Sequence, residues 1–342
     1  MKIEDYKISI VIPTFNRIGS LPRALDSALN QTYQPSEIIV VDNGSSDGTT
    51  KLLRERYPSI RLLIEKKLGV SAARNKGIRH SKFQWIALLD SDDAWDKTKL
   101  EKQKNALASS QDQFRLVHTD EIWIRNGNKF NQMKKHQKFG GDIFNNCLSL
   151  CCISPSSVLI NKNIFKEVGY FDESLPVCED YDLWLKICSQ EKILFINQKL
   201  TLKYGGHKDQ LSKTYWGMDR FRIKSLENLI LNYKLKPDQK INAIKTIVKK
   251  LKIIVNGAYK RNNSSIINKY EEKLFYWKNI NEIDQSQIIF DVAIANGDIN
   301  LLNKVKAKKK FAISYSVQPI EKFIRKNQLL SYLKNKPKII LI

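Results

Sequence analysis

Long apolar runs are missing from this sequence of 342 residues. No stretch approaches the roughly 18 to 20 apolar residues that a membrane-spanning helix needs, which argues against an integral membrane protein. The first residues, MKIEDYKISIVIP, also lack the basic-then-apolar pattern of a signal peptide, and their short apolar stretch is typical of a strand. We therefore expect a cytoplasmic protein.

Cysteine is scarce, and its spacing excludes the common cysteine-based sites. The five cysteines form no CxxC pair, and no histidine follows them at the spacing of a zinc site. We expect buried, reduced thiols at all five positions, which are Cys147, Cys151, Cys152, Cys178 and Cys188.

Two phosphate-binding glycine motifs are also missing. The sequence contains no GxxxxGK[ST] and no GxGxxG after its first predicted strand. These loops cradle phosphates with backbone N–H groups in nucleotide hydrolases and dinucleotide-binding domains. A phosphorylated substrate would therefore have to be held in another way.

Acidic residues are few in the C-terminal part of the chain. The formal net charge is +23 overall, with +5 in residues 1–200 and +18 in residues 201–342. Such a basic region is compatible with an anionic membrane face, an acidic partner or a solvated, lysine-rich surface. Nucleic acid is not an expected partner, because the region lacks interleaved aromatic residues and a recognised binding motif.

The N-terminal part alternates strands and helices. Its strands are continuously apolar, which is typical of a parallel sheet covered by helices on both faces. We expect the first strand to end at Pro13 and the following helix to be capped by Ser20. The four predicted strands are residues 7–12, 38–41, 60–64 and 85–90.

Beyond about residue 212 the strand signals nearly vanish and helical periodicity takes over. A chain of this length is long for one core and sufficient for a main domain with an appendage. We predict an α/β catalytic domain over residues 1–212 and a basic, mostly helical region over residues 213–342.

Three carboxylates follow the fourth predicted strand, in the stretch IALLDSDDAW. Asp90, Asp92 and Asp93 lie so close that their charges would repel each other by roughly several kcal/mol near a protein surface. A divalent cation such as Mg²⁺ or Mn²⁺ converts that repulsion into attraction. The alternative is a loop that leads to a helix capped by Asp96.

A metal held by one or two carboxylates keeps positions open for phosphate oxygens. The acid cluster therefore indicates a phosphorylated or diphosphate substrate. Asp42, at the end of the second strand, would repel phosphate, but it can accept hydrogen bonds from a base or a ribose. The carboxyl ends of the strands are where open α/β sheets bind ligands.

Five segments together carry a resemblance to a known family. In chain order they are ISIVIPTFNR, IIVVDNGSSDGT, GVSAARNKGI, LLDSDDAW and FDESLPVCEDYDLWLKI. This series resembles the family-2 nucleotide-sugar glycosyltransferases, which have a Rossmann-like GT-A fold with a mostly parallel central sheet. The resemblance covers roughly residues 6–212 and implies transfer of a sugar from a nucleotide donor.

The resemblance also implies roles for the residues at the first two strand ends. Asp42 would contact the nucleotide base, in a pocket lined by Pro13, Phe15 and Asn16. Arg74 and Asn75 would face the nucleotide, or would hold the neighbouring loop instead.

The remaining site residues implied by the resemblance lie later in the chain. Asp92 would face the ribose or the metal, Asp93 would bind the metal that bridges the diphosphate, and Asp90 would be the first acid of this motif. Asp180 would be the catalytic base, although it could merely favour the start of its helix. His207 would complete the metal site or touch the diphosphate, unless it is an ordinary loop histidine.

One base and one metal suffice for an in-line displacement of a nucleoside diphosphate, so we expect inversion. The processive members carry a QxxRW motif that this sequence lacks, which favours transfer of a single hexosyl or N-acetylhexosaminyl unit. The expected donor is a UDP-sugar and the acceptor a glycan or a lipid-linked hydroxyl in polysaccharide or lipopolysaccharide synthesis. The basic region suggests peripheral contact with an anionic membrane.

Two other functions remain as alternatives to sugar transfer. They are a metal-dependent phosphate-ester or nucleotide-processing enzyme, and a non-catalytic sugar-nucleotide-binding module.

Overall fold

The computed structural model describes residues 6–111, 113–206 and 215–286, with only the backbone over 281–286. The chain divides into two compact units, Met1–Lys240 and Ile241–Ile342. The first unit therefore extends beyond residue 212 and includes α9 (Asp219–Asn232), which packs on α7 (Glu179–Cys188). The boundary at 212 stays a prediction for the catalytic segment.

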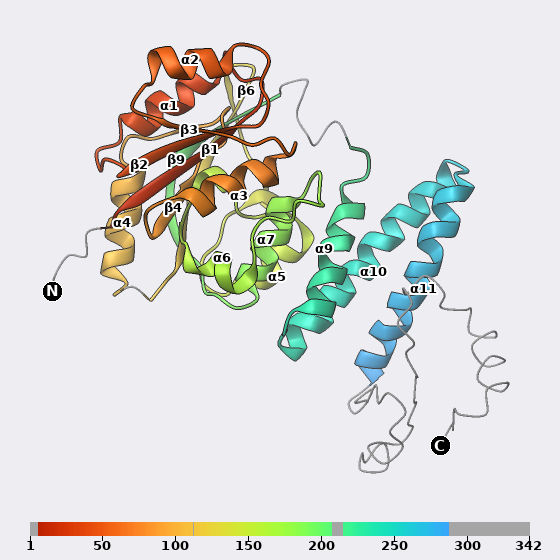
Figure 1. Cartoon of the computed structure of the whole chain (residues 1–342). Helices are drawn as coiled ribbons and strands as arrows, with labels where there is room; N and C mark the ends of the chain where they lie inside the picture. The colour runs from red at the N-terminus through yellow and green to blue at the C-terminus, as the bar shows by residue number, and fades with distance from the viewer. Residues whose placement is uncertain (1–5, 112, 207–214, 287–342) are drawn as a thin grey trace. The chain divides into compact units, whose positions relative to one another are not determined.

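The first half of the first unit alternates strands and helices as the sequence predicted (Figure 1). Its strands β3, β2, β1 and β4 lie side by side in that order, and all three pairings are parallel. The elements are β1 (Ile8–Thr14), α1 (Leu21–Leu29), β2 (Glu37–Asp42), α2 (Thr49–Arg56), β3 (Arg61–Ile64), α3 (Val70–His80) and β4 (Trp85–Leu88).

The second half extends the same sheet with antiparallel pairings, except that β6 and β9 pair in parallel. The order continues from β4 through β8, β6 and β9 to β5, and β7 pairs with β6. The further elements up to α7 are β5 (Ala94–Trp95), α4 (Lys99–Ser109), β6 (Leu116–Arg125), β7 (Asn128–Phe130), η1 (Lys134–His136), α5 (Phe144–Ser149), η2 (Pro155–Ser157), β8 (Val158–Asn161) and α6 (Asn163–Val168). The strand after α7 is β9 (Leu194–Gly205).

The mixed part of the sheet brings distant segments together. Short β5 directly follows Asp93 and pairs antiparallel with β9, so that Ala94 lies opposite Leu202. On its other side β9 pairs with β6 in parallel, and there Lys203 lies opposite Trp123. The acid cluster after β4 therefore ends beside β9, one strand away from β6.

The two faces of the parallel part have separate cores, as the alternation of side chains along a strand requires. Ile8, Ile10 and Ile12 belong to the larger cluster, which includes residues of α1, α2 and α4. Ile39 and Val41 of β2 pack on the opposite face against Ala73 of α3. Helices therefore cover both faces, and the apolar residues of β1, β2 and β4 are buried on both sides.

Two details of the first βα unit differ from the sequence prediction. Strand β1 does not end at Pro13: it continues to Thr14, and Pro13 lies opposite Val41. The nitrogen of Pro13 faces the β4 side, where pairing has already ended at Val11, so its missing N–H costs no hydrogen bond there. Ser20 precedes α1 but makes no capping hydrogen bond with its side chain, and its backbone is already helical.

The helices α10 (Pro237–Lys260) and α11 (Ser264–Ser286) follow α9. The hydroxyl of Tyr259 donates to Glu271 across 2.8 Å and ties the two helices near their connection. Ile244, Ile247 and Leu251 are buried along one face of α10, and Lys245 and Lys249 are exposed on the other. Within the described ranges no helix combines the length and the apolarity that crossing a membrane requires.

Candidate active site

Arg74 on α3 joins two segments that are far apart in the sequence. Its Nη2 atom lies 2.7 Å from Oδ1 of Asp90, and its Nη1 atom lies 2.7 Å from Oε1 of Glu179. The arginine is buried, with 4% of its surface exposed, and its ion pair with Glu179 is shielded from water, whereas Asp90 is partly exposed. One guanidinium therefore fixes the start of α7, which carries Asp180, against the turn that carries Asp92 and Asp93.

The acid cluster forms a tight turn, in which the backbone N–H of Asp93 donates to the carbonyl of Asp90 across 3.0 Å. The Asp93 carboxylate is buried and accepts from the hydroxyl of Ser156 at 2.6 Å and from the backbone N–H of Tyr204 at 3.0 Å. Burial, together with the charge of Asp92, raises the pKa of Asp93 well above its ordinary value. A nearby cation would stabilise its charged form.

Lys203 on β9 is one such cation. Its ammonium donates to the hydroxyl of Ser154 across 3.1 Å, and the residue as a whole is half-buried. Although burial alone would lower the pKa of Lys203, the charges of Glu121, Asp93, Asp90 and Asp180 raise it above its ordinary value. Lys203 and Arg74 therefore offset part of the repulsion among the carboxylates, for which the sequence analysis had invoked only a divalent cation.

Asp180 lies in the first turn of α7, and two hydrogen-bond donors hold its carboxylate. Its Oδ1 atom accepts from the backbone N–H of Tyr181 at 2.7 Å, and its Oδ2 atom accepts from the thiol of Cys151 at 3.3 Å. Burial and the nearby Asp180 charge raise the pKa of Cys151 well above its usual value, so the thiol stays neutral and can donate. Asp180 itself is only partly buried, which leaves it accessible to a substrate.

Glu179, the residue before Asp180, has a strongly shifted pKa. Burial and the charge of Asp180 raise the pKa of Glu179 to about 7, and the ion pair with Arg74 only partly offsets them. Two adjacent carboxylates in different environments are a common arrangement in acid–base sites, because their pKa values are pushed apart. Here the buried one pairs with Arg74, and the other is partly exposed.

The first two strand ends hold each other in place. Asp42 is buried, and its carboxylate accepts from the backbone N–H of Ser45 at 2.9 Å and from the hydroxyl of Thr50. Asn16, which follows β1 with a positive φ of 51°, accepts from the backbone N–H of Ser46 at 2.8 Å. The loop after β1 and the loop after β2 are therefore one connected structure.

Apolar side chains stand exposed around these two loops. Phe15 is 49% exposed, Ile18 43% and Leu68 73%. Ile18 and Leu68 approach the loop after β2 at Gly48 and Gly44. Exposed apolar side chains beside a buried carboxylate are suited to binding a planar ring that has an apolar face and polar edges. Pro13, by contrast, is buried within β1.

Arg74 and Asn75 make the protein contacts that the sequence allowed as an alternative to nucleotide binding. Asn75 donates to the carbonyl of Phe171 at 2.9 Å and to Glu173 at 2.8 Å, and it accepts from the backbone N–H of Phe171 at 3.0 Å. Both side chains therefore hold the segment before α7 against α3. Their contact with a nucleotide stays a prediction.

The residues around Asp93 fit a divalent cation that is shared with a substrate. Asp92 and Asp93 are adjacent carboxylates with a raised pKa on the buried one, and the oxygens of a diphosphate can complete such a site. The described ranges contain no group of three or more His, Cys, Asp or Glu side chains placed to hold a metal ion. His207, the third predicted ligand, lies outside the described residues.

Several residues of the site gave no usable signal in the sequence. Ser156 accepts from the backbone N–H of Asp90 at 3.0 Å and donates to Asp93, although it lies more than 60 residues away. Lys203 lies in the mixed polar and apolar segment LTLKYGG, which does not mark it as a site residue. Cys151 was expected to be merely buried, but it contacts Asp180. All five cysteines are free thiols, and four of them are buried.

Comparison with known proteins finds relatives in one enzyme family. A family model described as glycosyl transferase family 2 matches residues 9–169. The chain is similar to WfgD of Escherichia coli, a UDP-Glc:alpha-D-GlcNAc-diphosphoundecaprenol beta-1,3-glucosyltransferase, with 32% identity over 197 residues, which are 57% of this chain and 75% of WfgD. It is also similar to an uncharacterized glycosyltransferase of Rickettsia felis, with 30% identity over 275 residues, which are 78% of this chain and 44% of that protein.

This chain thus spans less than half of the length of the Rickettsia felis protein. Among solved structures, that of TarS 1-349 from S. aureus in complex with UDP-GlcNAc matches with a TM-score of 0.55 and 16% identity, over 84% of this chain and 94% of that one. The structural likeness shows a common GT-A fold, which confirms the α/β architecture expected from the sequence. From its family match and its similarity to WfgD, the chain belongs to glycosyltransferase family 2.

Proposed function

We propose that this chain is an inverting glycosyltransferase that moves one hexosyl or N-acetylhexosaminyl unit from a UDP-sugar to a hydroxyl group. The observation that carries the proposal is the pair of ion pairs made by Arg74, which holds Asp180 beside the turn of Asp92 and Asp93. Separated acids thereby gather at one edge of the sheet, as a transfer reaction needs: a base for the acceptor and charge stabilisation for the leaving group.

The donor would bind across the carboxyl ends of the first strands. The nucleotide base would lie near Asp42 and Asn16, with Phe15 exposed beside it and Pro13 below. The similarity to a protein solved with UDP-GlcNAc and to a UDP-Glc-dependent relative supports a UDP-linked donor. The diphosphate would then lie toward Asp90, Asp92 and Asp93.

Asp92 and Asp93, with His207, would hold a Mn²⁺ or Mg²⁺ ion together with the diphosphate. When bound, such an ion neutralises the charge that develops on the leaving diphosphate. Asp90 is committed to Arg74, so its role would be to hold the turn in place.

Asp180 would accept the proton of the acceptor hydroxyl. The acceptor oxygen forms a bond to the anomeric carbon as the bond from that carbon to the diphosphate oxygen breaks, and the nucleoside diphosphate leaves with the electron pair. The thiol of Cys151 and the N–H of Tyr181 hold the carboxylate in position. Attack opposite to the leaving group inverts the anomeric configuration, and a second nucleophilic carboxylate is not required.

A glycan or lipid-linked acceptor in cell-surface polysaccharide or lipopolysaccharide synthesis would suit this enzyme, and WfgD, by its name, acts on a diphosphoundecaprenol-linked sugar. We place the reaction in the cytoplasm, where nucleotide sugars are made, with peripheral contact to an anionic membrane. Exposed lysines on α10 support that contact, since each lysine near such a surface contributes about 1 kcal/mol; they include Lys245, Lys249 and Lys252.

The test is a panel of UDP- and GDP-sugars with Mn²⁺ or Mg²⁺, in which release of the nucleoside diphosphate is measured. We expect the native protein to hydrolyse at least one donor slowly, with water as the acceptor. Asp180→Asn should reduce this rate by roughly 10²–10⁴-fold. Asp238→Asn, at an exposed position on α10, is the matched control and should leave the rate unchanged. Equal rates for native protein and Asp180→Asn would refute the assignment of Asp180 as the base.

A further inference from the structure

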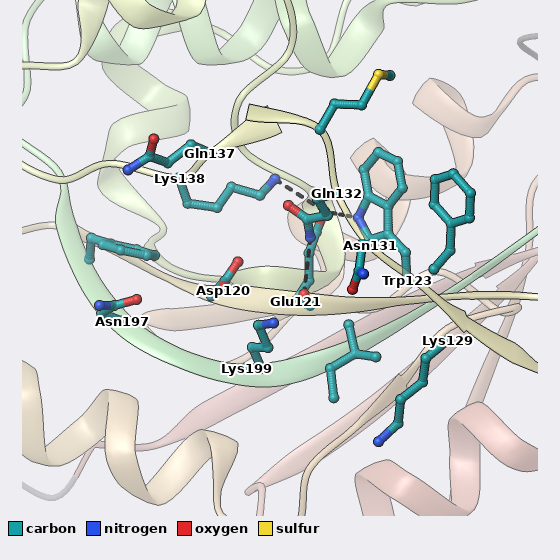
Figure 2. A pocket seen from close by; sticks show the side chains of 14 residues that line it. Asp120, Glu121, Trp123, Lys129, Asn131, Gln132, Gln137, Lys138, Asn197 and Lys199 are labelled. Carbon is teal, nitrogen blue, oxygen red and sulfur yellow. Dashed lines mark hydrogen bonds and ion pairs between the residues drawn. The ribbon is translucent and has the colours of Figure 1, made fainter. Parts of the chain in front are cut away.

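A cavity of about 570 Å³ opens beside β6 and β9 in the part of the chain that the structure describes (Figure 2). Its volume lies within the range of about 300–1,000 Å³ that small-molecule sites occupy. The walls come from β6, from β7 and the segment after it, and from the start of β9. None of the residues that the sequence singled out for catalysis or donor binding lines it.

The floor of the cavity is a buried ion pair. Nζ of Lys138 lies 3.2 Å from Oε1 of Glu121, and the side chains are only 4% and 1% exposed. The indole N–H of Trp123 donates to the same oxygen at 2.6 Å. Figure 2 shows both groups converging on Glu121. Burial alone would raise the pKa of Glu121, but the charges of Lys138 and Lys203 and the hydrogen bond from Trp123 outweigh it and lower the pKa to about 2.

The segment that covers the cavity is anchored at both ends, so the cavity is preformed. Gln132 donates to the backbone carbonyl of Glu121 at 3.0 Å. At the other end, Gly141 pairs with Ile193, and a Cβ at Gly140 would lie 2.8 Å from Cβ of Phe195. Only glycine fits this approach without a shift of the backbone.

The lining has the composition of a carbohydrate site. Exposed Phe130 and half-buried Trp123 offer apolar ring surface, against which the C–H face of a sugar packs. Asn131, Gln132 and Asn197 offer amides, each of which both donates and accepts and so matches sugar hydroxyls. The charged side chains of the lining are three positive and two negative, so the lining does not select a strongly charged ligand; they are Lys129, Lys138, Lys199, Asp120 and Glu121.

The cavity lies close to the proposed reaction centre. Trp123 is paired with Lys203 across β6 and β9, and paired residues project from the same face of a sheet. The charge of Lys203 interacts with Glu121, which lines the cavity, and also with Asp93 and Asp180 of the proposed reaction centre. Since neighbouring strands lie about 4.8 Å apart, β6 is on the order of 10 Å from β5, which follows Asp93 directly. That distance is spanned by one or two sugar units.

We propose that this cavity binds the saccharide acceptor and presents its hydroxyl to Asp180. The inference rests on the proposed function, because an acceptor site has meaning only beside a donor site. The donor would occupy the ends of β1, β2 and β4, and the acceptor would approach from the β6 side, so the two substrates meet at Asp180.

The test uses the indole N–H signal of Trp123 in an NMR spectrum of the whole 342-residue chain, assigned with Trp123→Phe. The probes are octyl glycosides of glucose, galactose, N-acetylglucosamine and N-acetylgalactosamine. We expect at least one glycoside to shift this signal. The double variant Asn131→Ala with Asn197→Ala should weaken its binding by about tenfold, which corresponds to about one lost hydrogen bond. Asn128→Ala, on β7 but outside the cavity, is the matched control and should bind as the native protein does.

The cavity assignment is overturned if no glycoside of the panel shifts the Trp123 signal, or if the double variant binds as tightly as the native protein. Donor hydrolysis by the native protein, measured on the same sample, separates this result from the proposed function. Hydrolysis without glycoside binding removes the cavity assignment alone. Glycoside binding without hydrolysis of any donor supports the cavity and counts against the proposed transfer reaction.

Discussion

Arg74 and Glu179 form a buried ion pair with 2.7 Å between Nη1 and Oε1, although they are 105 residues apart in the sequence. The same guanidinium holds Asp90 with its other terminal nitrogen. This arrangement determines where Asp180 lies relative to Asp92 and Asp93. The position of the proposed base therefore depends on a residue that is neither the proposed base nor a proposed metal ligand.

Removing the guanidinium of Arg74 should lower the free energy of unfolding. Arg74→Met leaves the buried Glu179 and the partly exposed Asp90 without their cation, and breaking a buried pair typically costs about 3–5 kcal/mol. Arg74→Lys keeps the charge, but a single ammonium cannot reproduce two divergent hydrogen bonds. We expect urea unfolding to show the full loss for Arg74→Met and a smaller one for Arg74→Lys, whereas donor hydrolysis by the folded Lys variant should fall with UDP affinity retained. An unchanged rate in Arg74→Lys would show that the bridge does not position Asp180.

Close packing of α3 on the sheet gives a second prediction. A Cβ added at Gly77 would lie 2.3 Å from Cγ1 of Val11, so Gly77→Ala should overpack the core and destabilise the protein by about 1–3 kcal/mol. Gly19 has no atom within 4 Å of such a Cβ, so Gly19→Ala is the matched control and should change stability by less than about 1 kcal/mol. Thermal or urea unfolding of both variants measures the difference. Equal effects would contradict the packing argument.

Stability should depend on pH through His118. Burial and the charge of nearby Lys138 lower its pKa to about 4, against which the carbonyl of Phe139 and the charge of Glu121 act only in part. Between the ordinary value near 6.5 and the folded value, the unfolded chain takes up a proton that the folded chain does not. Stability should therefore fall as the pH drops from about 6.5 to 4, by about 3 kcal/mol at most.

The measurement compares urea unfolding of native protein and His118→Gln at pH 7.5 and pH 5. Glu179 works in the opposite direction, because its raised pKa of about 7 favours the folded state as the pH drops, so the native curve alone mixes both effects. The loss of stability between the two pH values should be smaller in the variant, since Glu179 is present in both proteins. The account of His118 is wrong if the two losses are the same.

Much of the parallel half of the sheet could be predicted from the sequence. Continuous apolar strands such as 38–41, each followed by a polar loop, indicate buried parallel strands whether or not a homologue is known. Pro13 misled the prediction because a proline ends pairing only where its N–H would have had a partner, and β4 has already ended beside it. That is a property of the neighbouring strand, which the local sequence does not contain.

The acid cluster shows a different limit. Three adjacent carboxylates correctly indicated a need for positive charge, but the sequence could not show that Arg74 and Lys203 supply part of it. Both cations reach the cluster through long-range pairing of strands and helices. For the same reason Ser156 and Cys151, which hold Asp93 and Asp180, and the cavity beside Trp123 were not predicted.

Separate measurement of nucleotide binding and turnover in Asp93→Ala and Asp180→Asn tests the central claim most directly. Calorimetric titration of UDP with Mn²⁺ should show weaker, less metal-dependent binding for Asp93→Ala and native-like binding for Asp180→Asn. Donor hydrolysis at saturating nucleotide sugar should be nearly lost in Asp180→Asn. If Asp180→Asn turned over donor like the native protein, or if Asp93→Ala bound UDP with undiminished dependence on Mn²⁺, the two carboxylates would not have the roles assigned here.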